Sequence, residues 1–189
     1  MTRRLALALA ACTLVAATAV AQQPIDSAYT RQIRASTSEP RFNTDLTDYL
    51  PADPRIPTPL AALGYVPGTV GRLSRVADIN RYFRALAAAS PRVHIFSIGM
   101  SDEGREMIAA AFADSATIAN LDTYREITRR LADPRGLSEQ EARALIGRGK
   151  PIYYVTGSIH SPETGSPEML LELAYRLVVD EGPMYRNIR

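Results

Sequence analysis

The sequence lacks several of the residues and motifs on which common enzyme classes depend. Its single cysteine is Cys12, which excludes both an internal disulfide bond and a metal site built from cysteine ligands. It contains no G-x-S-x-G nucleophile elbow, no Walker loop and no H-E-x-x-H motif. The commonest serine hydrolases, the P-loop nucleotide-binding proteins and the H-E-x-x-H metalloproteases are therefore excluded.

A strong charge of one sign is also missing. The 22 basic and 20 acidic residues leave a formal net charge of +2, and no run of five or more lysines and arginines occurs. Nucleic-acid-binding proteins usually carry such a basic patch. We therefore expect no nucleic-acid partner.

The remaining composition is typical of one globular domain. A length of 189 residues falls within the range of about 100–200 residues that one domain usually occupies. Hydrophobic residues make up 46% of the chain and charged residues 22%, which leaves enough apolar side chains to bury a core. We therefore expect neither wholesale disorder nor a two-domain enzyme.

Residues 1–21 have the three parts of a secretory signal peptide. A positively charged start at 1–4 precedes an apolar run at 5–20, and the Ala-Val-Ala at 19–21 fits an A-x-A cleavage site. An apolar run of about sixteen residues is shorter than the roughly 20 that span a bilayer. We expect export to the periplasm or the extracellular space, with no transmembrane segment in the mature chain.

A second processing route uses the cysteine. The Leu-Ala-Ala-Cys at 9–12 resembles a bacterial lipobox, and cleavage there would leave Cys12 acylated and the protein anchored to a membrane. The apolar run continues well past Cys12, whereas a lipoprotein turns polar directly after its cysteine. Cleavage after Ala21 is therefore the favoured prediction.

Residues 22–72 predict a proline-rich lead-in. Seven prolines are spread through this segment, and no apolar pattern of period two or 3.6 lies between them. We expect an extended segment, with regular structure beginning near Ser74. Six apolar side chains offer anchors with which it could wrap the domain surface: Tyr49, Leu50, Ile56, Leu60, Leu63 and Tyr65.

Beyond the lead-in, apolar residues recur with the periods of helices and strands. A period of 3.6 predicts a helix over 76–89. Two β-rich runs at 93–98 and 107–113 flank a short polar loop and predict a hairpin. A further helix is predicted from Leu121, and another after the capping box at 138–141.

The last part of the chain predicts a buried strand followed by a helix. The continuous apolar run at 151–156 is typical of a strand buried on both faces. A loop follows, and Ser166-Pro167 opens a helix whose charged residues form a polar stripe at i, i+4 spacing: Glu168, Glu172, Arg176 and Asp180. The opposite face is apolar. The order of elements predicts an α/β fold.

His160 and Glu163 lie in the loop that leaves the predicted buried strand. Ligands bind at the carboxyl ends of strands in open α/β sheets. Imidazole and carboxylate are both zinc ligands, and a separation of three residues in such a turn can bring them onto one ion. The spacing alone also suits a loop histidine beside a solvated acid at a helix start. Thr164 follows the pair, so the H-x-x-E-H pattern is absent.

Two segments resemble the M14 family of zinc carboxypeptidases. The G-S-I-H-S-P-E at 157–163, between a strand and a helix opened by Ser-Pro, is similar to the first metal-ligand motif of that family, a strand followed by G-x-H-x-x-E. The residues at 97–105 resemble its S-x-G-x-S-x-E-G-R hairpin. The resemblance covers about 74–189 and is weakest over 115–150.

The resemblance implies a fold, a cofactor and a reaction. It implies a mixed β-sheet flanked by helices, one Zn²⁺ ion, and hydrolysis of peptide or amide bonds, usually at a C-terminal residue. His160 and Glu163 would be the first two zinc ligands. Residues 73–189 would then be the N-terminal part of an M14-like domain, with a peptide or amide as its substrate and partner.

The resemblance also implies that part of the site lies elsewhere. The family's third ligand, a histidine, lies far downstream of this motif, as do its carbonyl-polarising arginine and its glutamate base. No histidine follows Glu163. We expect the catalytic residues beyond Arg189, an incomplete sheet, and, for the 189 residues alone, weak zinc binding and no hydrolysis.

Some residues depart from the family pattern. Pro162 stands where many members have an arginine that helps to bind substrate. Residues 114–150 insert two predicted helices where pancreatic-type members connect two strands directly, which suggests a bacterial secreted subgroup. Two other functions stay open: a zinc amidohydrolase or deacylase of the same fold, and a noncatalytic secreted binding module.

Other chemistry-bearing residues have structural interpretations. His94 lies in a predicted strand on the face shared with Phe96, which favours a strand residue over a ligand. Glu103 and Arg105 could form an ion pair across the hairpin, and an exposed pair of this kind contributes only about 0–1 kcal/mol. Gly104 suits the turn itself.

Overall fold

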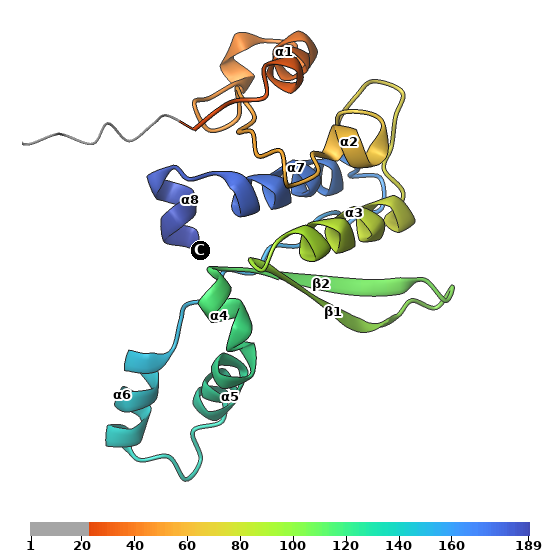
Figure 1. Cartoon of the computed structure of the whole chain (residues 1–189). Helices are drawn as coiled ribbons and strands as arrows, with labels where there is room; N and C mark the ends of the chain where they lie inside the picture. The colour runs from red at the N-terminus through yellow and green to blue at the C-terminus, as the bar shows by residue number, and fades with distance from the viewer. Residues whose placement is uncertain (1–22) are drawn as a thin grey trace, which may run out of the picture.

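The computed structural model describes residues 23–189 (Figure 1). The predicted signal peptide at 1–21 and Cys12 lie outside the described residues, so their processing stays a prediction. The elements in chain order are α1 (Ser27–Ser36), the 3₁₀ helix η1 (Pro40–Phe42), α2 (Pro59–Leu63), α3 (Val76–Ala89), β1 (Val93–Met100), β2 (Glu106–Phe112), α4 (Ser115–Ala119), α5 (Leu121–Ala132), α6 (Glu139–Arg148), α7 (Gly165–Val179) and α8 (Pro183–Ile188).

Helix α3 lies between the β1–β2 hairpin and α7 and contacts both (Figure 1). The segment that carries α1 and α2 covers the other side of α7, and α4, α5 and α6 extend away below the hairpin. The predicted α/β class is confirmed, as the described residues combine helices with a small antiparallel sheet. No helix within residues 23–189 combines the length and the apolarity needed to cross a bilayer.

The hairpin forms where the sequence predicts it. Val93 pairs with Phe112 at one end of the antiparallel ladder and Met100 with Glu106 at the other. The register shifts between Ser97 and Gly99, and Gly99 has a φ of 121°, a conformation that glycine adopts without steric cost. The predictions of α3, α5 and α6 are also confirmed, and both hydrogen bonds of the α6 capping box are present.

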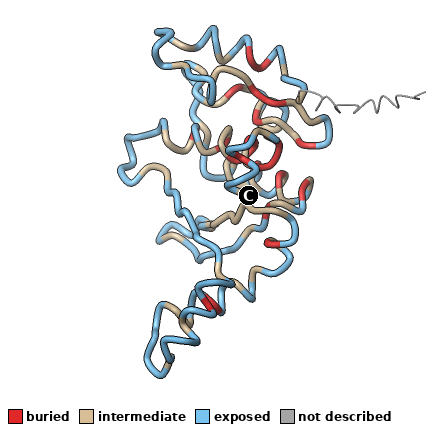
Figure 2. The backbone as a smooth tube through the Cα atoms, turned by 90° about the vertical axis from the view of Figure 1, so that its left-hand side faces the viewer, coloured by how far each residue is buried: buried red, intermediate tan, exposed pale blue. Residues whose placement is uncertain are grey.

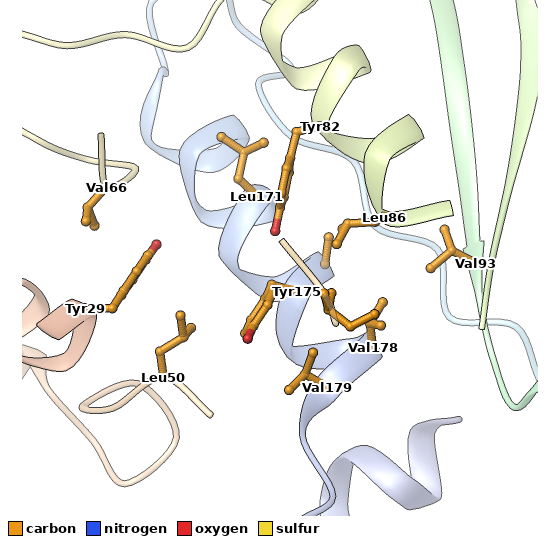
Figure 3. Close-up of a cluster of buried hydrophobic side chains, with 12 residues drawn as sticks. Tyr29, Leu50, Val66, Tyr82, Leu86, Val93, Leu171, Tyr175, Val178 and Val179 are labelled. Atoms are coloured by element: carbon orange, nitrogen blue, oxygen red, sulfur yellow. The ribbon is translucent and has the colours of Figure 1, made fainter. Parts of the chain in front are cut away.

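The core is shared by the N-terminal segment, α3, β1 and α7. Figure 3 shows side chains from all of them in one buried cluster. Three tyrosines at its centre have no exposed surface: Tyr29, Tyr82 and Tyr175. Figure 2 shows that buried residues concentrate in this part of the molecule, whereas only a few lie in the α5–α6 excursion.

The prediction that regular structure begins near Ser74 is wrong, because α1, η1 and α2 all precede it. Short-range capping starts both α-helices: the Asp26 side chain accepts a hydrogen bond from the Tyr29 amide, and Thr58 caps α2. Such caps depend on single polar residues, and the two helices carry no apolar periodicity from which the sequence could predict them. The predicted anchoring role of the lead-in is confirmed at Leu50 and Ile56, which are buried in the core.

The polar stripe of α7 is buried against the N-terminal segment. Arg176 donates to the Tyr49 carbonyl, and Asp180 accepts a hydrogen bond of 3.1 Å from the Tyr49 hydroxyl. Burial raises the pKa of the Glu172 carboxyl, against the opposing effect of Arg176. The amphipathic pattern therefore does not separate a buried face from a solvated one, since the stripe has polar partners far away in the sequence.

The strand predicted at 151–156 is not formed in this structure. These residues adopt no regular structure, and Tyr153 is 92% exposed. A strand needs a neighbour for its backbone hydrogen bonds, and within residues 23–189 β1 and β2 pair only with each other. The segment is correctly read as apolar and β-rich, but its burial depends on a partner strand that local sequence does not specify.

Candidate metal centre

The loop that carries His160 and Glu163 is held tightly against the first turn of α7. A Cβ atom on Gly157 would lie 2.8 Å from Leu170 Cδ1 and 3.2 Å from the Pro167 nitrogen. A side chain at this position would require Leu170 to move and would crowd the Pro167 nitrogen, so glycine is the residue that fits here without rearrangement. The close approach fixes where the loop begins relative to the helix.

The carbonyl of His160 organises the turn. It accepts a hydrogen bond of 3.0 Å from the Ser158 hydroxyl and another of 3.0 Å from the Glu163 amide. Ser158 has a φ of 63°, in the left-handed region that non-glycine residues rarely occupy. The backbone between the two candidate ligands therefore forms a closed turn, supported by groups from both of its ends.

This turn brings the two predicted ligands together. His160 Nδ1 lies 3.1 Å from Glu163 Oε1, and the two side chains are 70% and 55% exposed. Ligand atoms at about 2.0–2.1 Å from a tetrahedral zinc ion are separated by roughly 3.3 Å. The donor atoms and their spacing fit a zinc ion, and their exposure leaves room for further ligands.

Two ligands are all that the described residues supply. Among residues 23–189 no group of three or more histidine, cysteine, aspartate or glutamate side chains could hold a metal ion. The other histidine, His94, lies on β1 opposite Ala111, with its ring edge-on to Phe96 at a centroid distance of 4.6 Å. Its strand position agrees with the structural interpretation of this histidine.

The hairpin tip also has the predicted structural role. Glu103 and Arg105 form an exposed ion pair, and Gly104 takes a φ of 73° in the turn between them. The pair belongs to the turn that joins β1 to β2. Nothing in this arrangement adds a ligand to His160 and Glu163.

Sequence reasoning missed a groove beside the ligand loop. Its volume is about 1000 Å³, and the ligand loop contributes Ser158, Ser161 and Thr164 to its lining. Residues 71–76 form another part of the lining, and α3 and the start of α7 contribute the rest. The groove therefore brings the end of the lead-in next to the candidate ligands.

Glu168 holds these two parts of the chain together. Its buried carboxylate accepts hydrogen bonds from the Ser74 amide at 2.6 Å, the Ser74 hydroxyl at 3.0 Å and the Gly68 amide at 3.2 Å. The sequence identifies Glu168 only as an acid at a helix start. Its actual partners are about a hundred residues away, and no local signal reveals them.

A family model described as zinc carboxypeptidase, peptidase M14, matches residues 79–189. The match covers more than half of the chain and includes most of α3, the hairpin, the ligand loop and α7. No curated protein and no solved structure matches the chain.

Proposed function

The chain belongs to the M14 zinc carboxypeptidase family, and we propose that it carries two of the zinc ligands of an exported metallocarboxypeptidase. The observation that carries the proposal is the 3.1 Å approach of His160 Nδ1 to Glu163 Oε1 in the family-matched segment. The reaction would be hydrolysis of a peptide bond at the C-terminal end of a peptide.

The two side chains would hold the ion in complementary ways. His160 offers the lone pair of a neutral imidazole at Nδ1, while Glu163 offers a carboxylate whose negative charge offsets part of the charge of the cation. The turn closed on the His160 carbonyl leaves the two side chains in contact with each other. Zinc, when bound, supplies the Lewis acidity that activates water for attack on a carbonyl.

The remaining catalytic groups would come from outside the described residues. A catalytic zinc site has three protein ligands and one open position. Residues 23–189 offer His160 and Glu163 without a third partner. We therefore expect these residues alone to bind zinc weakly and to hydrolyse no peptide.

The size of the groove favours a peptide over a small N-acyl amino acid. A volume of about 1000 Å³ is at the upper end of the range for small-molecule sites, about 300–1000 Å³. A peptide of several residues would fill such a groove, whereas a single acylated residue would leave most of it to water. This observation supports the carboxypeptidase over the deacylase of the same fold.

Activity is measured with the full-length protein on a series of peptides that differ in length and in their C-terminal residue. We expect release of C-terminal residues, loss of activity on chelation and recovery with added zinc. Glu163→Gln should lower kcat/KM by at least about a hundredfold, because it removes a charged ligand, while Glu103→Gln at the exposed hairpin turn should not. Chelator-insensitive cleavage, or equal activity of Glu163→Gln and the parent, would refute the proposed role.

Export is proposed from the sequence of residues 1–21. Mass spectrometry of protein recovered from the periplasm or the medium of a bacterial host should give a mature N-terminus at Gln22. Cys12→Ser should leave this processing unchanged. A lipid-modified N-terminus at Cys12, lost in Cys12→Ser, would contradict cleavage after Ala21.

A further inference from the structure

We propose that the groove beside the ligand loop is a subsite for an acidic side chain of the peptide substrate, with Arg72 and Arg75 as the groups that bind its carboxylate. The inference deepens the proposed function and rests on it. It assigns a substrate class, peptides with aspartate or glutamate near the hydrolysed bond, to a surface that the candidate ligands do not occupy.

The groove runs beside the candidate ligands. Ser158 and Ser161, which flank His160 in the chain, are both part of its lining. Ile79, Phe83 and Leu170 give it an apolar portion from α3 and α7. When the bond to be hydrolysed lies near the ligand pair, the peptide residues next to that bond would therefore lie in the groove.

Two exposed arginines give the groove its positive charge. Arg72 and Arg75 belong to the lining, and neither forms an ion pair with any residue in the range 23–189. Most other arginines of the described chain are paired with an acid. An arginine that keeps its donors free can bind a ligand carboxylate through two parallel N–H···O bonds.

The one carboxylate in the lining does not cancel this charge. Glu168 is buried, and its two oxygens already accept three hydrogen bonds from Gly68 and Ser74. It is therefore occupied as an anchor and does not pair with either arginine. The lining therefore has two arginines without an acidic partner in the described residues and one buried carboxylate, so the exposed part of the groove is positively charged.

The backbone that carries the arginines is well ordered by its hydrogen bonds. The Arg72 amide donates to the Thr69 carbonyl at 3.0 Å, and Ser74, between the two arginines, is bound to Glu168 and to the Tyr65 hydroxyl. The Arg75 carbonyl accepts from two amides in the first turn of α3. Binding would therefore order the side chains but not the loop, which lowers the entropic cost.

Two helix starts add to the positive potential. The first residue of α3, Val76, lines the groove, as does Pro167 in the first turn of α7. Neither helix has a side chain that caps its first amides. Free amides and the helix dipole favour an anion at such ends, and this effect acts in the same direction as the two arginines.

The openness of the groove favours a side chain over the terminal carboxylate of the peptide. Leu73, between the two arginines, is 64% exposed, and both arginines are exposed as well. A pocket that selects a chain end has to block a longer chain. An open groove blocks nothing, so the carboxylate it binds belongs to a residue along the peptide.

The test compares labelled peptides that differ by one charge. Hexapeptides carrying a single glutamate at one of the last three positions are paired with glutamine counterparts, each with a free or an amidated C-terminus. Their affinity for the metal-free full-length protein is measured by fluorescence anisotropy. We expect at least one glutamate peptide to bind about fivefold more tightly than its glutamine counterpart, with either C-terminus.

Variants assign this preference to the groove. The double variant Arg72→Gln/Arg75→Gln should lose the preference for glutamate. The matched control Arg31→Gln/Arg186→Gln, which removes the same charge at two other exposed arginines, should keep it. Equal affinity of the wild type for every glutamate and glutamine pair would overturn the inference, as would an equal loss in both double variants. A preference that vanishes on amidation would assign the groove to the terminal carboxylate and overturn it too.

Zinc content separates this inference from the proposed function. Arg72→Gln/Arg75→Gln should retain the zinc content of the parent, whereas His160→Ala should lose zinc and keep the glutamate preference of the metal-free protein. If His160→Ala keeps its zinc, the ligand assignment fails while the subsite stands. If zinc binding follows the ligand assignment and no glutamate preference exists, the subsite alone fails.

Discussion

Gly157 packs against α7 at the point where the ligand loop begins. A Cβ atom added at Gly157 would lie 2.8 Å from Leu170 Cδ1 and 3.2 Å from the Pro167 nitrogen, so the glycine backbone packs directly against the start of α7. The loop residues that follow form short-range hydrogen bonds, two of which go to the His160 carbonyl. Packing at Gly157 therefore helps to fix the start of the loop that carries the ligand pair.

Gly157→Ala should therefore destabilise the protein by about 1–3 kcal/mol, because the added methyl group overpacks a site with no free space. Chemical denaturation followed by circular dichroism measures the change. Gly165→Ala is the matched control, since a Cβ there meets no atom within 4 Å. A Gly157→Ala protein as stable as the parent would show that the loop is not packed against α7 in this way.

Glu172 shows how a partly buried acid makes stability depend on pH. Burial raises its pKa above the ordinary value of 4.5, with Arg176 and Tyr29 acting in the opposite direction. The folded protein therefore binds this proton more tightly than the unfolded chain does. The stability contribution of Glu172 is complete below pH 4.5 and is lost as pH rises through the raised pKa.

The prediction compares Glu172→Gln with the parent across this range. The free energy of unfolding of the parent, relative to that of the variant, should be highest near pH 4 and fall as pH rises, because the amide does not ionise. Glu126→Gln should give the opposite slope, since a hydrogen bond from Arg129 lowers the pKa of Glu126. A pH-independent difference between the parent and Glu172→Gln would contradict the burial of an ionisable carboxyl.

At the scale of the elements, sequence patterns predict the locally determined parts of the fold. The α3 helix, the β1–β2 hairpin and the α6 capping box depend on residues a few positions apart, and the structure confirms all three. Helices α1 and α2 were missed because their signals are single caps without apolar periodicity. The prediction of a strand at 151–156 is wrong, because a strand forms only when another strand, distant in the sequence, pairs with it.

The candidate site also has a part that the sequence predicts and a part that it does not. The approach of His160 to Glu163 follows from a separation of three residues in one turn, so sequence spacing could predict it. The groove could not be predicted, because Glu168 connects α7 to Gly68 and Ser74, which lie 100 and 94 residues earlier in the chain. Even the helix start differs slightly: α7 begins at Gly165 after Thr164, without a capping side chain.

At the scale of the whole molecule, the N-terminal segment is part of the core. Tyr29 and Leu50 are fully buried among residues of α3 and α7 (Figure 3). The same segment satisfies polar groups of α7, where Arg176 and Asp180 meet Tyr49. Residues 23–72 therefore act as a structural layer over α7, and the chain is expected to unfold as one unit in this region.

Leu50→Ala tests this integration. It should lower the free energy of unfolding by about 2–5 kcal/mol, because it leaves a cavity in the core. Leu46→Ala should change stability by less than about 0.5 kcal/mol, since Leu46 is 50% exposed. Both are measured by urea denaturation. If the two variants were equally stable, the N-terminal segment would not be part of the core.

The metal content of histidine variants shows whether His160 and Glu163 bind one zinc ion. The full-length protein is purified with zinc present, dialysed, and analysed by inductively coupled plasma mass spectrometry. His160→Ala should retain almost no zinc, whereas His94→Ala, which removes the exposed histidine of β1, should retain about one ion per chain. Stoichiometric zinc in His160→Ala would exclude His160 as a zinc ligand.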